Sequence, residues 1–188
     1  MQLTPFKMLV SPVPIARQLA VQWHGPQMYG DQPYVVHLDE VVAILTEYEH
    51  TDEPTLMGGY LHDVLEDHPE VGAPGLSKAG IPTKVIQAVQ FCTDEPGHNR
   101  KTRKANTYQR VRNTLDALSF DPPGGYLLMG LRVKLADRLA NLRSTIRQGS
   151  SLLQMYQKET RAFRDAYYIS GVCNPMWTEY DRLLGLLP

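Results

Sequence analysis

Apolar residues recur at helical spacing along most of the chain. A first helix is predicted between Ser11-Pro12, which is typical of a helix start, and Gly25. Its apolar side is formed by Ile15, Leu19 and Trp23. The same spacing predicts further helices over residues 38–48, 55–66, 85–92, 108–118, 126–147, 152–169 and 174–187. Residues 69–82, rich in glycine and proline at their start, are predicted to form a surface connection.

The fold class follows from what the pattern lacks. No segment shows sustained two-residue alternation, and no repeat of about 20 to 50 residues is visible in the sequence. We therefore predict an all-α fold. A length of 188 residues is typical of one domain, so residues 1–188 are expected to form a single helical domain whose functional motifs lie between about 11 and 170.

Charge and composition exclude several classes of protein. The 19 basic and 20 acidic residues leave a net charge of −1, which removes the long-range attraction of a general nucleic-acid binder. We expect no stable nucleic-acid partner. The apolar stretch Met8-Leu9-Val10 is short, and no apolar run approaches the ~18 residues of a membrane span. The two cysteines form no CxxC pair, so a cytoplasmic protein without membrane association is expected.

The hexapeptide His62-Asp63-Val64-Leu65-Glu66-Asp67 is the strongest candidate for chemistry. At about 100° per residue on a helix, its four polar side chains fall within one arc. One interpretation is a solvated face of an amphipathic helix, the usual place of charged residues. The other is a functional site. Gly59 and Thr55 continue the arc toward the N-terminus, and such small residues would leave room for a ligand.

A second polar arc supports the functional interpretation. Asp137 and Asn141 lie one helical turn apart, on the face opposite a row of leucines. With His37, just before the second predicted helix, the chain offers two imidazoles and two carboxylates on three separate helices. Such a mixed nitrogen and oxygen set suits a hydrated divalent ion such as Mn²⁺ or Fe²⁺, and it lacks the thiolates of a structural zinc site.

The sequence resembles the HD-domain metal-dependent phosphohydrolases. His37, His62-Asp63 and Asp137 match their H...HD...D pattern. Residues 33–37, 62–67 and 134–143 are similar, in this order, to the PYxxHP, HDxxED and KLADRLxNxR motifs of the RelA/SpoT-type alarmone hydrolase domain. The chain is most similar to the stand-alone small alarmone hydrolases. The resemblance implies a metal-dependent pyrophosphohydrolase that releases pyrophosphate from the 3′ position of (p)ppGpp or ppApp.

The resemblance also implies a role for individual residues. The ion, Mn²⁺ with Fe²⁺, Co²⁺ or Mg²⁺ as alternatives, would be held by His37, His62, Asp63 and Asp137. Glu66 and Asp67, one turn further, would orient or deprotonate a bound water and return a proton to the leaving oxygen. Contacts to the nucleotide are expected from Tyr34, Asn141, Ser144 and Tyr156. Whether the chain forms a homodimer stays open.

One segment concentrates positive charge on this nearly neutral chain. Residues 98–112 contain six Lys or Arg residues and no acidic residue. A substrate with several phosphates needs such a patch, and Lys101 and Lys104 are expected to contact the phosphates. The alternatives are a solvated basic loop or a nucleic-acid contact.

The chain departs from the family pattern at one place. Members commonly carry an Arg-Lys pair nine and eight residues before the first metal histidine, where this chain has Met28 and Tyr29. Tyr29 offers a ring for stacking on a base but supplies no charge. The departure leaves an adenine alarmone, NADPH or a (d)NTP open as substrates. A non-catalytic nucleotide sensor or antitoxin-like partner is the alternative from another class of protein.

Overall fold

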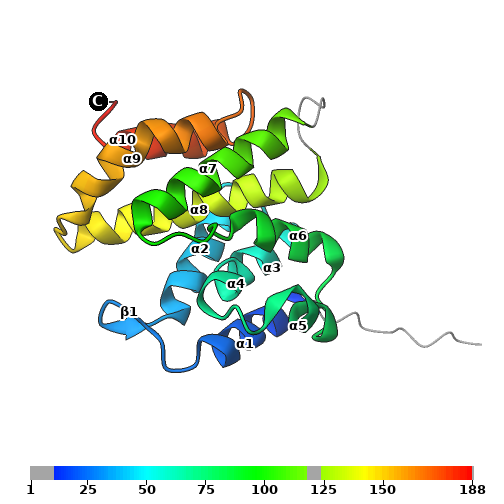
Figure 1. The fold of residues 1–188 in the computed structure, drawn as a ribbon. Coiled ribbons are helices and arrows are strands. Elements are labelled where there is room, and N and C mark those ends of the chain that lie inside the picture. The colour runs from blue at the N-terminus through cyan, green and yellow to red at the C-terminus, as the bar shows by residue number, and fades with distance from the viewer. Residues whose placement is uncertain (1–10, 118–123, 188) are drawn as a thin grey trace, which may run out of the picture.

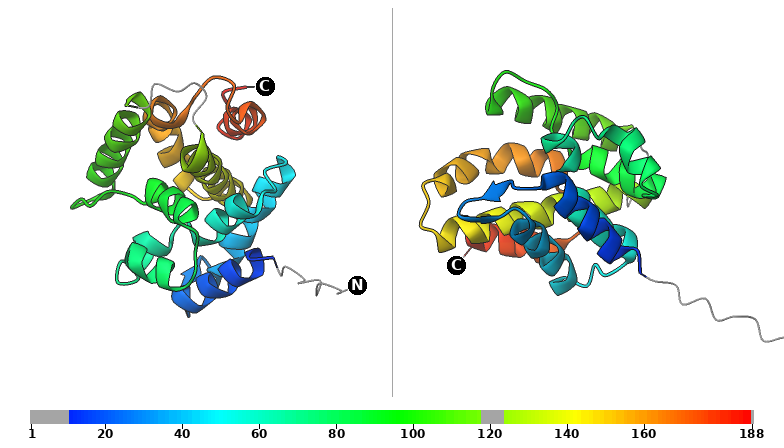
Figure 2. Two further views of the ribbon diagram at one scale, coloured as in Figure 1. Left: turned by 90° about the vertical axis from the view of Figure 1, so that its right-hand side faces the viewer. Right: turned by 90° about the horizontal axis from the view of Figure 1, so that it is seen from below.

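Helix α8 (Gly125–Arg147) lies at the centre of the molecule and contacts α2, α3, α6, α9 and α10 (Figure 1). In the left view of Figure 2, α1 lies on one side of α8, and α9 and α10 lie on the other. The computed structural model describes residues 11–117 and 124–187. Its elements are α1 (Val13–His24), β1 (Met28–Tyr29), β2 (Gln32–Pro33), α2 (Val35–Glu47), α3 (Glu53–Leu61), α4 (Val64–Asp67), α5 (Gly72–Lys78), α6 (Thr83–Cys92), α7 (Arg100–Asp116), α8, α9 (Leu152–Tyr167) and α10 (Asn174–Leu183).

The prediction of an all-α fold is confirmed. The predicted apolar face of the longest helix lies in the core. The leucines of α8 at positions 131, 135, 139 and 142 are buried against the surrounding helices. The described strands are the two-residue β1 and β2, which pair antiparallel with Met28 opposite Pro33. This small hairpin was not predicted, because two-residue strands give no alternating pattern.

The predicted helix over residues 55–66 is in fact two helices. Asp52 caps α3 by accepting a hydrogen bond from the Thr55 amide at 3.1 Å, and α3 then ends at Leu61. Helix α4 begins at Val64, so His62 and Asp63 lie at the break.

The expectation that Gly59 leaves room for a ligand was wrong. A Cβ atom there would lie 2.9 Å from Leu45 Cδ1, so the glycine instead lets α2 and α3 pack closely.

Two other expectations are corrected. The predicted connection over residues 69–82 contains α5, because Pro74 is tolerated in the first turn of a helix and Leu76 is fully buried. The helix predicted to begin at residue 108 begins eight residues earlier, at Arg100, where the Asn99 side chain accepts from the Thr102 amide at 2.9 Å. Its predicted last residue, Leu118, lies outside the described residues, as does the segment 1–10.

The last two helices are shorter than predicted. Helix α9 ends at Tyr167 and α10 at Leu183, whereas the apolar pattern continued to residues 169 and 187. Over residues 11–117 and 124–187, no helix combines the length and the apolar character that crossing a bilayer requires.

Candidate active site

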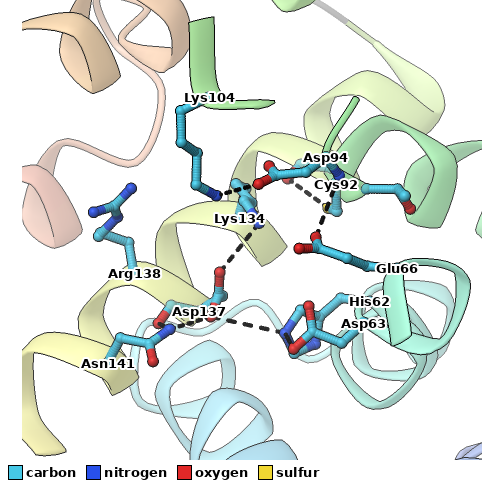
Figure 3. A network of polar contacts seen from close by, with 12 residues as sticks. His62, Asp63, Glu66, Cys92, Asp94, Lys104, Lys134, Asp137, Arg138 and Asn141 are labelled. Atoms are coloured by element: carbon cyan, nitrogen blue, oxygen red, sulfur yellow. Dashed lines mark hydrogen bonds and ion pairs between the residues drawn. The ribbon is translucent and has the colours of Figure 1, made fainter. Parts of the chain in front are cut away.

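A polar pocket opens between α2, the α3–α4 break, α7, α8 and α9. It is lined by Tyr29, Tyr34, His37, Asp63, Glu66, Arg100, Lys104, Lys134, Asp137, Arg138, Asn141 and Tyr156. Three of the four residues predicted as metal ligands, His37, Asp63 and Asp137, line it, and the fourth, His62, is buried beside Asp63. His37 comes from α2, His62 and Asp63 come from the α3–α4 break, and Asp137 comes from α8. Figure 3 shows His62, Asp63 and Asp137 facing one another.

Each histidine brings its Nε2 atom within 4 Å of a carboxylate oxygen of both Asp63 and Asp137. His37 Nε2 lies 3.4 Å from Asp137 Oδ1 and 3.7 Å from Asp63 Oδ2. His62 Nε2 lies 2.9 Å from Asp63 Oδ2 and 3.8 Å from Asp137 Oδ1. An ion about 2.0 to 2.2 Å from each ligand would separate neighbouring ligand atoms by about 3 to 3.5 Å. Ligand atoms of His37, His62 and Asp63 all lie within 4.8 Å of one another, and Asp137 Oδ1 lies within 4 Å of both histidines, so the cluster has the size of a site for one divalent cation.

The orientation of His62 supports this assignment. Its Nδ1 lies 2.8 Å from the carbonyl oxygen of Gly59, so Nδ1 donates and Nε2 faces the cluster. Nε2 is buried and makes no hydrogen bond with any described residue. A buried polar atom without a partner is costly, and a metal ion would satisfy it. The donor set contains imidazole and carboxylate but no thiolate, which fits a hard or borderline divalent ion.

The two carboxyl groups of the cluster stay ionised, and this negative charge favours the binding of a cation. Burial raises the pKa of Asp137, but Lys134, with Nζ 3.3 Å from Oδ2, and the histidines lower it more, so the carboxylate stays charged. Burial likewise raises the pKa of Asp63, and His62 lowers it further than burial raises it. Burial lowers the pKa of His62, but the two carboxylates raise it to about 10. A cation that binds His62 Nε2 therefore displaces a proton.

A second layer of side chains holds the predicted ligands in place. The Tyr34 hydroxyl donates to Asp63 Oδ2 at 2.6 Å, and Asn141 Nδ2 donates to Asp137 Oδ1. The Tyr29 hydroxyl in turn donates to Asn141 Oδ1 at 2.9 Å, and its ring stacks on His37 with centroids 4.6 Å apart. Tyr34, predicted as a substrate contact, thus has its hydroxyl committed to a predicted ligand. Outer hydrogen bonds of this kind fix ligand orientation.

The structure separates Glu66 from Asp67. Glu66 lines the pocket, and burial raises the pKa of its carboxyl group. Its Oε2 accepts from the Asp94 amide at 3.3 Å. Asp67 is not among the lining residues, and its Oδ2 accepts from Gln27 Nε2 at 2.8 Å. The predicted catalytic pair therefore does not face the pocket as a pair.

Four cations form one wall of the pocket: Arg100 and Lys104 from α7, and Lys134 and Arg138 from α8. We call these residues the cationic wall, and Figure 3 shows three of them, Lys104, Lys134 and Arg138. Each cation has a counter-charge. Lys104 Nζ lies 2.7 Å from Asp94 Oδ2, Lys134 contacts Asp137, and Glu159 accepts from both arginines. Three members were not predicted, although Lys134 and Arg138 share the helical face of Asp137 and Asn141.

The remaining predicted substrate contacts, Tyr156, Ser144 and Lys101, differ in whether they line the pocket. Tyr156 lines the pocket, with the Arg138 guanidinium 4.8 Å from its ring centroid. Ser144 is buried beside the pocket, and its Oγ accepts from Gln148 Nε2 at 3.2 Å. Lys101 is exposed, because the basic segment is helical and α7 turns this side chain to solvent. Of the two predicted phosphate contacts, Lys104 lines the pocket together with Arg100, and Lys101 is not among the lining residues.

Comparison with known proteins gives consistent matches. Residues 16–163 match the HD domain family. The chain is 33% identical over 132 residues to a GTP pyrophosphokinase of Streptomyces coelicolor, covering 69% of this chain and 14% of that protein. It is 27% identical over 124 residues to a probable guanosine-3′,5′-bis(diphosphate) 3′-pyrophosphohydrolase of Mycoplasma pneumoniae, covering 65% of this chain and 16% of that protein. The chain thus spans only a small part of these curated relatives.

A solved structure matches over nearly its whole length. It is that of a metazoan ortholog of SpoT, which hydrolyses ppGpp and plays a role in starvation responses. The TM-score is 0.72 at 25% sequence identity, and the match covers 95% of this chain and 98% of the other.

Proposed function

Because this chain belongs to the HD-domain family, we propose that it is a metal-dependent pyrophosphohydrolase of a phosphorylated nucleotide, with (p)ppGpp or ppApp as substrate and pyrophosphate as product. One observation carries the proposal. Two imidazoles and two carboxylates converge at cation-binding distances beside Glu66, and the cationic wall faces them across the same pocket. The similarity to a ppGpp-hydrolysing SpoT ortholog supports the substrate class.

The ligand set would be His37, His62, Asp63 and Asp137, and we propose Mn²⁺ as the ion, with Fe²⁺, Co²⁺ and Mg²⁺ as alternatives. A divalent ion bound there supplies positive charge to a phosphoryl oxygen and a water of lowered pKa. The mixed nitrogen and oxygen ligands favour Mn²⁺ or Fe²⁺ over Mg²⁺, because Mg²⁺ prefers ligand sets made of oxygen alone.

Glu66 is the candidate proton acceptor. It lines the pocket, and its raised pKa lies closer to neutrality than that of an exposed glutamate, which suits proton transfer. In the proposed reaction, water adds to phosphorus, its proton passes to Glu66, and the bond from phosphorus to the 3′ oxygen breaks. Glu66 then returns this proton to the 3′ oxygen, which stays on the nucleotide as a hydroxyl group. Lys134 and Lys104 would stabilise the charge of the pyrophosphate.

A product assay tests this function. Purified chain is incubated with Mn²⁺ and separately with ppGpp, ppApp, NADPH and dNTPs, and the products are separated by ion-exchange chromatography. From ppGpp or ppApp we expect equimolar pyrophosphate and a nucleotide that retains its 5′ phosphates. The control is Glu66→Gln, which should still bind substrate. Binding of ppGpp without any product from native chain would indicate the sensor alternative instead.

The hairpin favours a second candidate, a substrate whose base is not selected by charge. Residues 25–33, which contain β1 and β2, include no Lys or Arg, and Tyr29 presents an aromatic ring at the pocket. An uncharged aromatic surface stacks on any base and does not select guanine by charge. We therefore include ppApp, NADPH and a (d)NTP as candidates of the same assay.

A further inference from the structure

A chain of side chains connects Asp67 to the proposed metal ligand Asp63 through Gln27, His24 and Tyr34. Gln27 Nε2 donates to Asp67 Oδ2 at 2.8 Å, and Gln27 Oε1 lies 2.8 Å from His24 Nδ1. The His24 ring stacks on Tyr34, with centroids 4.4 Å apart and planes 23° apart. The Tyr34 hydroxyl then donates to Asp63 Oδ2 at 2.6 Å.

The direction of each hydrogen bond in this chain is determined. An ionised carboxylate only accepts, so the Gln27 amide must present Nε2 to Asp67. Gln27 Oε1 is then the acceptor, and His24 Nδ1 carries the proton. Asp67 thereby fixes the amide of Gln27, and through it the tautomer and the plane of His24.

The middle of the chain is packed tightly. His24 is only 3% exposed, and the edge of the His68 ring contacts it with centroids 5.1 Å apart. Tyr34 lies between the face of His24 and the edge of His37, whose centroid is 5.7 Å away. The ring of Tyr34 therefore has little freedom to turn, and its hydroxyl is held on Asp63.

We propose that Asp67 is a positioning residue, which holds Tyr34 against the metal ligand Asp63 through Gln27 and His24, and that it transfers no proton in the reaction. The inference rests on the proposed metal-dependent hydrolysis and differs from the paired role implied by the resemblance. Proton transfer needs a contact of about 2.6 to 3.2 Å or one bridging water, and Glu66, not Asp67, lines the pocket.

The test compares a substitution that keeps the anchor with one that removes it. In Asp67→Asn the amide oxygen still accepts from Gln27, so we expect the Kd for Mn²⁺, measured by calorimetric titration with Mn²⁺ alone, to stay within about threefold of native and kcat to fall less than about tenfold. In Asp67→Ala the anchor is lost, and Mn²⁺ affinity should fall by roughly 10-fold or more.

Two further variants keep the test decisive. Tyr34→Phe should weaken Mn²⁺ binding by about 10- to 100-fold, because it removes the hydrogen bond to Asp63. Its matched control is Tyr48→Phe, whose hydroxyl donates to Glu179 and not to a predicted ligand. Glu66→Gln should instead lower kcat by about 10² to 10⁴ and leave Mn²⁺ affinity unchanged.

The inference would be overturned in either of two ways. If Asp67→Asn lost as much kcat as Glu66→Gln at native Mn²⁺ affinity, Asp67 would be a proton-transfer residue. If Asp67→Ala and Tyr34→Phe bound Mn²⁺ as tightly as native chain, the positioning role would be wrong. The calorimetric titration needs no nucleotide, so it decides the positioning role even if no substrate of the product assay is hydrolysed.

Discussion

Lys104 and Asp94 form an ion pair inside the cationic wall, with Nζ 2.7 Å from Oδ2 and the Asp94 side chain only 2% exposed. The two residues come from separate segments, α7 and the loop after α6. Asp94 also donates its backbone amide to Glu66. The ion pair therefore lies between the proposed phosphate contacts and the proposed proton acceptor, and the amide of Asp94 links it to Glu66.

The first prediction separates Lys104 from its neighbour Lys101. Lys104→Met should raise the KM for ppGpp by about 10- to 100-fold, because a charge-assisted hydrogen bond contributes roughly 1.5 to 3 kcal/mol. Lys101→Met is the matched control on the same helix, and it should leave KM within about twofold, because exposed charges contribute little. Since Lys104→Met leaves Asp94 unpaired, the double variant with Asp94→Asn is assayed beside it. Equal KM values for the two single variants would remove Lys104 from the proposed site.

The second prediction concerns the pH dependence of turnover. Burial raises the pKa of Glu66, and a proton acceptor works only when it is deprotonated. The profile of kcat should therefore fall on its acidic side, with a midpoint above the value of about 4.3 for a free glutamate. Stopped assays across pH 4 to 8 at saturating Mn²⁺ would measure it, and a midpoint at or below the ordinary value would contradict the role of Glu66.

The third prediction concerns stability. Glu159 accepts from Arg100 and Arg138, and although burial raises its pKa, the hydrogen bond and charge of Arg100 lower it more. A group whose pKa is lowered on folding contributes stability above its unfolded pKa and loses it as the pH falls. Glu159→Gln should cost about 1.5 to 3 kcal/mol at pH 7 in urea unfolding, and this difference should shrink below a pH of about 4. A difference independent of pH would contradict the charge interaction.

Features that are set by residues within one helical turn can be predicted from this sequence, whereas features that depend on contacts between separate segments cannot. Asp137 and Asn141 were predicted to share a face because helical periodicity acts within one turn. The break between α3 and α4 was missed because no glycine or proline marks it between Leu61 and Val64. The contact of Asp67 with Gln27, 40 residues earlier, could not be predicted either, because it joins separate segments. Which face of α7 meets the pocket also depends on tertiary packing.

The fourth prediction concerns Met28 and Tyr29, which replace the Arg-Lys pair common in the family. If Met28 and Tyr29 have changed the preference for the base, then Met28→Arg with Tyr29→Lys should increase kcat/KM for ppGpp relative to ppApp. A cation over a base contributes roughly 1 kcal/mol at a partly exposed site, or about fivefold in this ratio. An unchanged ranking of substrates would assign recognition to Asn141 and the cationic wall instead.

We propose that a metal-bound pocket in this chain hydrolyses a nucleotide pyrophosphate, and isotope transfer from water distinguishes this reaction from the alternatives. The chain is stripped of metal with a chelator, given ppGpp or ppApp in H₂¹⁸O, and then supplied with Mn²⁺, with Asp63→Ala as the control that lacks a ligand. We predict no turnover before Mn²⁺ is added, and afterwards pyrophosphate that carries one ¹⁸O, measured by mass spectrometry. Pyrophosphate release that is independent of metal or undiminished in Asp63→Ala, or ¹⁸O in the nucleotide instead of the pyrophosphate, would contradict the claim.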